Sequence, residues 1–378
     1  MHPPPASDVV SPGTAACSRE DELALLLVGT AARRRATADR IAVLSAEVDD
    51  RRLFGTLARQ RVLLLGGERR IEAAPDTVSD WFRERLEQAR AASRVRAMAF
   101  SAVTHRVTGR LEELAIPAVA LKGAGLSEEL YGDAAMRHYD DIDVLVPADA
   151  LTRAVSEAHA MGWVAAHRSP LHDTLVHPGG APPLELHWRI HWYEAAFASE
   201  LIGRSQVVDG RRQLETLDQF AALLLYYARD GFAGLRLVAD IAAWWDRHGS
   251  ADAVRMLVAR IPDGQPLAAA WRTALGVATR VAGLGLAAPE ARSRRETLAR
   301  RLVNWDRRGD PDQVMANVTL VDGLLAPAGG LGAFLGRLHA VAGVARTAAR
   351  YLLALWHLRG GRVWSPLPRS AEAGTGAR

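Results

Sequence analysis

The sequence is poor in cysteine and has no long uncharged apolar run. Cys17 is the only cysteine among 378 residues, which excludes an internal disulfide framework and a cysteine-based zinc cluster. This fits a reducing compartment, so we expect a cytoplasmic protein. The opening MHPPPASDVVSPG has no basic region followed by an apolar core, so it does not resemble a signal peptide. The longest apolar candidate, Leu331 to Leu358, contains arginines and histidines, which favours an amphipathic helix over a membrane span.

The composition is that of an ordinary globular chain. Hydrophobic residues make up 49% and charged residues 24%, and the length permits two or three domains with substantial cores. The 47 basic and 43 acidic residues give a net charge of +4. This mild bias permits an anionic substrate but does not indicate nucleic acid in particular.

Hydrophobic periodicity divides the chain into regions. Residues 1–18, rich in proline and serine, are predicted to be disordered. Helical spacing over 19–115 gives way at Ile116-Pro117 to short apolar runs, which predict an α/β core over 116–210. Helical spacing returns over 211–360, and 361–378 is predicted to be a mobile tail. In the first helical region, Thr77 is the predicted cap of the helix that follows Pro75.

The core region contains five short runs that predict strands and two that predict helices. The helices are expected over Ala124 to Tyr131 and over Ala148 to Met161, the latter closed by Gly162. The strands are expected over Pro117 to Leu121, Asp141 to Val146, Trp163 to His167, Asp173 to His177 and Leu184 to Trp188.

Two aspartates flank one apolar residue in Asp141-Ile142-Asp143. On a strand, alternation would place both carboxylates on one exposed face, about 6.6 Å apart along the chain. A buried acid pair without a cation would repel and leave one acid protonated. The pattern therefore indicates a divalent-metal site, and the alternative is a solvated strand edge.

A third acid could join this pair from another strand. In Leu184-Glu185-Leu186-His187-Trp188, alternation separates Glu185 and His187 from the apolar residues. If this strand lies beside the first, Glu185 completes a set of three carboxylates. Such a set can hold two divalent cations about 3.5–4 Å apart and support in-line displacement of pyrophosphate. His187 is a candidate for supporting a ligand or transferring a proton, and the alternative for Glu185 is the polar face of an exposed strand.

Lys122 and Gly123 lie between a predicted strand and a predicted helix. Glycine permits close backbone approach, helix N–H groups favour an anion and lysine adds a positive charge, so this turn is a candidate phosphate site. Arg137, four residues before Asp141, could reach a phosphate from its loop. The alternatives are a plain turn and a solvated loop arginine.

The order of these motifs resembles a known family. LKG, a helix, an arginine before DIDVLV, another helix and then LELHW are similar to the bacterial proteins labelled uncharacterised nucleotidyltransferase, a branch of the DNA polymerase β-type superfamily. The resemblance covers Val119 to Trp188, with a weaker echo over Leu235 to Ile241. It implies an α+β fold with a small mixed-sheet core flanked by N- and C-terminal helical regions. It also implies that Asp141, Asp143 and Glu185 are metal ligands and that Lys122 and Gly123 hold a triphosphate, where the wider superfamily has Gly-Ser.

The first functional hypothesis is a nucleotidyltransferase that depends on Mg²⁺ or Mn²⁺. A nucleoside triphosphate would bind at Asp141 and Asp143, Glu185 would orient or activate the acceptor, and pyrophosphate would leave. The acceptor could be a small molecule, a peptide or protein side chain, or an RNA end. Two alternatives are a non-catalytic nucleotide-binding accessory protein and an Asp-x-Asp glycosyltransferase using a nucleotide sugar. The glycosyltransferase is disfavoured because about 90 helical residues stand where a nucleotide-binding βαβ half is usual.

Overall fold

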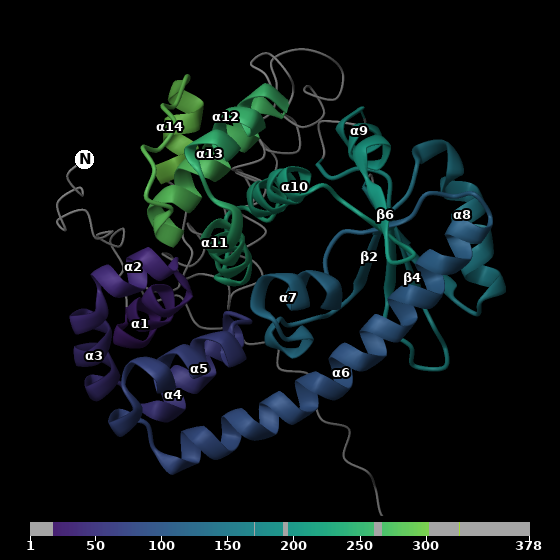
Figure 1. Cartoon of the computed structure of the whole chain (residues 1–378). Helices are drawn as coiled ribbons and strands as arrows, with labels where there is room; N and C mark the ends of the chain where they lie inside the picture. Colours follow the sequence, from purple (N-terminus) through teal and green to yellow (C-terminus); the bar gives the residue numbers. More distant parts are fainter. Residues whose placement is uncertain (1–17, 170, 192–195, 261–266, 302–324, 326–378) are drawn as a thin grey trace, which may run out of the picture.

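A five-stranded mixed sheet lies among the helices of the computed structural model, which describes residues 18–169, 171–191, 196–260, 267–301 and 325 (Figure 1). The strands are β1 (Val119–Ala120), β2 (Ile142–Leu145), β3 (Val164–Arg168), β4 (His172–Val176) and β5 (Leu184–His187). Their order is β1-β2-β5-β4-β3, in which β2 and β5 are parallel and the other neighbours are antiparallel. The predicted α+β fold with a mixed sheet is confirmed.

The two faces of the central strands differ in chemistry. Ile142, Val144, Leu184 and Leu186 are fully buried in one hydrophobic cluster with residues of α6 (Asp80–Glu113) and α8 (Leu151–Ala160). The period of two along a strand therefore sends the residues between them to the opposite face. Asp143 and Glu185, which are register partners, share that opposite face.

The N-terminal helices lead into α6, which has 34 residues. They are α1 (Arg19–Val28), α2 (Ala31–Ala36), α3 (Ala38–Glu47), α4 (Asp50–Arg59) and α5 (Leu63–Ala73). The predicted cap at Thr77 is wrong, because Thr77 ends the short 3-10 turn η2 (Pro75–Thr77). Ser79 caps α6 instead, where its hydroxyl accepts a hydrogen bond from the backbone N–H of Phe82.

The helices that follow the sheet pack against the N-terminal helices in a cluster that also contains Val119 of β1 and Leu145 of β2. One hydrophobic cluster joins residues of α1, α4 and α5 to α10, α11 and α13. A two-stranded ribbon, β6 and β7, precedes α10 and crosses the predicted boundary at residue 210. The elements are α7 (Ala124–Tyr131), η3 (Ala134–Met136), η4 (Ala148–Ala150), α9 (Ala196–Arg204), β6 (Gln206–Val208), β7 (Arg211–Gln213), α10 (Thr216–Arg229), α11 (Arg236–His248), α12 (Ala251–Arg260), α13 (Ala268–Ala278), η5 (Thr279–Gly283) and α14 (Arg294–Arg301).

Several predicted segments fall outside the described residues. They are the N-terminus up to Cys17, the amphipathic helix over Leu331 to Leu358 and the tail over 361–378. Among the helices that are described, none is both long enough and apolar enough to cross a bilayer.

Candidate active site

The Lys122-Gly123 turn connects β1 to α7, as the sequence predicts. Gly123 has φ 103° and ψ −155°, a backbone conformation that side chains with a Cβ rarely adopt. No side chain caps the start of α7. The helix therefore presents its first-turn N–H groups without a side-chain acceptor, an arrangement that favours an anion.

The Lys122 side chain points to Asp143. Its Nζ lies 3.2 Å from Asp143 Oδ1 and 4.3 Å from the centre of the Tyr226 ring on α10. Lys122 is also the only lysine in the sequence, where every other member of the 47 basic residues is arginine. Counting lysines in the sequence would therefore have drawn attention to Lys122 without a structure.

Asp143 lies on a buried strand face. All four residues of β2 are buried, and Asp143 is 4% exposed, so the expectation of an exposed strand face is wrong. The physical reason is that Lys122 and His187 contact the carboxylate, and the ring of Tyr226 on α10 covers the Lys122 ammonium. Asp141 immediately precedes β2 and is half-buried.

The two aspartates differ in how their charge is balanced. Burial raises the pKa of Asp141 to about 6, and the negative charges of Asp143 and Glu185 add to this rise. Burial also acts upward on Asp143, but the Lys122 ammonium and the His187 hydrogen bond hold the pKa of that carboxyl well below its usual range. The three acids thus form a concentration of negative charge that Lys122 only partly neutralises.

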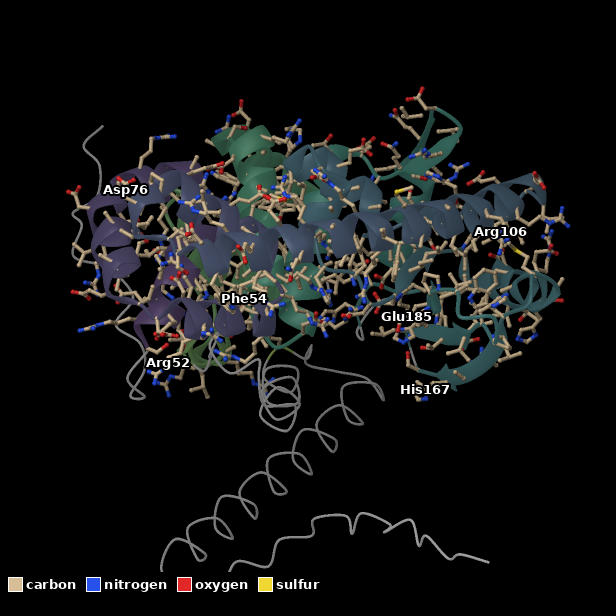
Figure 2. All side chains as sticks on the ribbon, turned by 90° about the horizontal axis from the view of Figure 1, so that it is seen from below. Arg52, Phe54, Asp76, Arg106, His167 and Glu185 are labelled. Carbon is tan, nitrogen blue, oxygen red and sulfur yellow. The ribbon has the colours of Figure 1, made fainter. Side chains whose placement is uncertain are left out.

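Glu185 lies opposite Asp143 in the parallel β2–β5 pair. The two strands are therefore neighbours, as the set of three carboxylates requires. Figure 2 shows Glu185 where the sheet meets the helices, with His167 farther out on the sheet. Burial acts to raise the pKa of Glu185, but the hydrogen bond from His187 and the nearby His172 hold it below its ordinary value.

His187 joins two of the three predicted acids, Asp143 and Glu185. Its Nε2 lies 3.0 Å from Asp143 Oδ1 and 3.3 Å from Glu185 Oε2, and the residue is fully buried. The expectation that His187 supports this group of acids is consistent with these contacts. Its role in catalysis remains a prediction.

The sequence reading missed His172, which faces Glu185 from β4. Its Nε2 lies 3.5 Å from Glu185 Oε1, and its ring centre lies 4.7 Å from that of His187. Burial and the neighbouring His187 lower the pKa of His172 to about 4, which leaves its imidazole neutral at pH 7. A hairpin folded symmetrically about Gly179-Gly180 pairs residue 172 with residue 187, and this symmetry is the signal that could have found it.

Arg137 has a partner outside the cluster of acids. Its Nε donates to Asp240 Oδ2 of α11 at 2.9 Å, and Tyr131 of α7 donates to Oδ1 of the same carboxylate at 2.8 Å. The buried Nη2 of Arg137 has no hydrogen-bond partner among the described residues. The predicted contact with a phosphate therefore cannot use Nε, which Asp240 holds, while Nη2 is available for it.

Two cavities border the segment from Lys122 to Asp143. One, of about 310 Å³, is lined by Lys122 together with polar residues of α6, α7 and β7, among them Thr104, Glu128 and Arg211. The other, of about 360 Å³, is lined by Arg61, Arg96, Arg137 and His138 beside apolar residues of α4, α5 and α6. Both offer space for a small polar molecule, one beside Lys122 and the other beside Arg137.

The acids, the lysine and the mixed sheet are the features on which the resemblance to nucleotidyltransferases rests. A family model described as uncharacterised nucleotidyltransferase matches residues 46–279, which is more than half of the chain. The chain therefore belongs to this family, which confirms the resemblance seen in the motifs. Comparisons with curated proteins and with solved structures found no match.

Proposed function

We propose that this protein is a metal-dependent nucleotidyltransferase. It moves a nucleoside monophosphate from a nucleoside triphosphate to an acceptor hydroxyl or phosphate and releases pyrophosphate. The observation that carries the proposal is the parallel pairing of β2 with β5, because it places Asp143 beside Glu185 in a chain of this family. The acceptor is a small molecule, a peptide or protein side chain, or an RNA end.

The residues present fit a divalent cation. Asp141 and Asp143 supply carboxylate oxygens, the ligands that Mg²⁺ and Mn²⁺ prefer, and the raised pKa of Asp141 reflects an excess of negative charge that a cation would relieve. Bound there, Mg²⁺ or Mn²⁺ would screen the charge of the triphosphate and stabilise the leaving pyrophosphate.

The triphosphate is held by the turn between β1 and α7. Gly123 allows the backbone to approach the phosphates, and the first N–H groups of α7 donate to them. Lys122 shares its positive charge between Asp143 and the phosphates. Arg137 can add one donor through Nη2 while its Nε stays on Asp240.

Glu185 orients the acceptor and accepts its proton. Its carboxylate is partly exposed, and the hydrogen bond with His187 keeps it ionised at neutral pH, the form that can accept a proton. His187 contacts both this base and Asp143. The proposed metal ligand and the proposed base are therefore connected through one imidazole ring.

Transfer of a labelled nucleotide tests the proposed reaction. The protein is incubated with each α-labelled nucleoside triphosphate, Mg²⁺ or Mn²⁺ and cell extract, and the label is followed into protein, RNA and small-molecule fractions. We expect transfer by the wild type and by the exposed control Asp149→Asn, but none by Asp141→Asn/Asp143→Asn. Label arriving from a nucleotide sugar alone would favour the glycosyltransferase alternative.

The single lysine allows a binding test that needs no acceptor. Growth on ¹³C-lysine labels Lys122 as the single lysine, so one set of side-chain signals reports this site by NMR. We expect Mg²⁺ and a triphosphate together to shift these signals in the wild type and not in Asp141→Asn/Asp143→Asn. A shift without any transfer would favour the accessory-protein alternative, and no shift in the wild type would remove the proposed triphosphate site.

A further inference from the structure

Two imidazoles and one carboxylate converge at the β4–β5 hairpin. The candidate ligand atoms of His172, Glu185 and His187 all lie within 4.8 Å of one another. Each Glu185 oxygen faces a different histidine, Oε1 toward His172 Nε2 at 3.5 Å and Oε2 toward His187 Nε2 at 3.3 Å. The antiparallel register fixes this geometry, because His172 and His187 are direct partners across the two strands.

The protein does not satisfy the nitrogen atoms of these rings by itself. The Nδ1 atoms of His172 and His187 are buried and have no hydrogen-bond partner among the described residues. At the other nitrogen of His187, two carboxylate oxygens compete, since Asp143 Oδ1 lies at 3.0 Å and Glu185 Oε2 at 3.3 Å. One N–H cannot donate well to both oxygens, whereas a cation near them can attract both.

The type of ligand selects the type of ion. Mg²⁺ prefers oxygen ligands and octahedral geometry, whereas imidazole suits Zn²⁺ and its transition-metal neighbours. Two histidines and one glutamate are a recurrent zinc ligand set that leaves a coordination position open. The side chains of His172 and Glu185 are each 19% exposed, so an ion can reach the group from solvent.

We propose that His172, Glu185 and His187 form a binding site for a divalent transition-metal ion of the Zn²⁺ type, distinct from the oxygen-ligand site at Asp141 and Asp143. Glu185 belongs to this group through its contacts and to the three carboxylates through its register with Asp143. The proposal adds a second ion of different chemistry to the proposed active site, and while this ion is bound Glu185 acts as its ligand, so its role as a base belongs to the protein without the ion. Binding of this ion does not depend on the proposed function. Only the role of the bound ion rests on it.

Zinc affinity of the full-length, tag-free protein tests this site. Zn²⁺ is titrated against a chromophoric chelator in the presence of millimolar Mg²⁺, and the bound metal is counted by elemental analysis after dialysis. We expect one tightly bound Zn²⁺ that Mg²⁺ does not displace. His172→Ala should weaken binding by at least about 100-fold, since changes to residues that only support a ligand already cost 10–100-fold.

Matched variants separate loss of a ligand from loss of the fold. His159→Ala removes an exposed histidine from α8, on the far side of the sheet, and should bind Zn²⁺ like the wild type. Glu185→Gln keeps the shape of the side chain and should also weaken binding. Thermal melting in EDTA should be the same for His172→Ala and His159→Ala, and Co²⁺ should give intense visible absorption only where all three ligands remain.

The outcomes also separate this proposal from the proposed function. Asp141→Asn should lose the triphosphate-dependent NMR shift yet keep Zn²⁺ affinity. Tight Zn²⁺ binding without nucleotidyl transfer would support the ion site and contradict the proposed function. Equal Zn²⁺ affinity in the wild type and His172→Ala, displacement by Mg²⁺, or no tight binding at all would each overturn the ion site.

Discussion

Replacing Arg137 by methionine should destabilise the fold strongly. The side chains of Arg137 and Asp240 are 4% and 1% exposed, and the ion pair between them is 2.9 Å long. Removing the arginine leaves the Asp240 carboxylate buried with Tyr131 as its remaining hydrogen-bond donor. Breaking a buried pair in this way costs about 3–5 kcal/mol, a large part of the 5–15 kcal/mol that is usual for total stability.

Urea unfolding followed by circular dichroism and tryptophan fluorescence measures this loss. Arg255→Met is the matched control, because the Arg255 and Asp252 side chains are 72% and 68% exposed and such pairs contribute about 0–1 kcal/mol. The midpoint for Arg137→Met should fall well below that of the control.

A compensating variant tests the reason for the loss. Arg137→Met/Asp240→Leu/Tyr131→Phe removes the charge, its partner and the hydroxyl together, so no buried polar group is left unpaired. We expect it to recover most of the stability that Arg137→Met loses. Equal midpoints for Arg137→Met and Arg255→Met would refute the reasoning.

Two further predictions concern acid stability and one turn. Burial alone would raise the pKa of Asp50, but hydrogen bonds from Ser79 and the Arg70 guanidinium hold it below 3.8. Its stabilising effect is therefore complete above pH 3.8 and is lost as the pH falls further, so the melting temperatures of wild type and Asp50→Asn should differ at pH 7 and approach one another as the pH is lowered below 3.8. Gly123→Ala should cost about 1–3 kcal/mol because φ is 103°, as measured by thermal unfolding. Gly109→Ala, in the interior of α6 with open space at the Cβ position, should instead stabilise by about 1 kcal/mol, and equal effects of the two changes would contradict the argument.

The sequence predicts well what depends on local periodicity. Alternation along Asp141-Ile142-Asp143 and Leu184 to His187 assigns acids and apolar residues to opposite faces, and the structure has Ile142 and Leu186 in the core as predicted. The period of a strand is fixed by backbone geometry, so no knowledge of distant residues is needed.

Distant partners were not predictable from local patterns. Arg137 and Asp240 are 103 positions apart, and the Lys122 ammonium that pairs with Asp143 lies over the ring of Tyr226 of α10. Neither contact produces a pattern in the residues next to it in the sequence, so neither can be predicted from that pattern. The wrong cap at Thr77 has a different cause, since Thr77 and Ser79 both suit the role and the intervening 3-10 turn decides between them.

Helix α6 is one continuous helix that connects the two hydrophobic clusters. Phe82 and Leu86 near its start belong to the cluster of the N-terminal helices, and Val107 and Leu111 near its end belong to the cluster beneath the sheet (Figure 1). At 1.5 Å per residue its 34 residues span about 50 Å. A bend of roughly 10° at its middle would move one end by about 4 Å, more than the length of a hydrogen bond. The straightness of this helix therefore contributes to the alignment of the N-terminal helices with the sheet, together with the packing of Val119 and Leu145 in the first cluster.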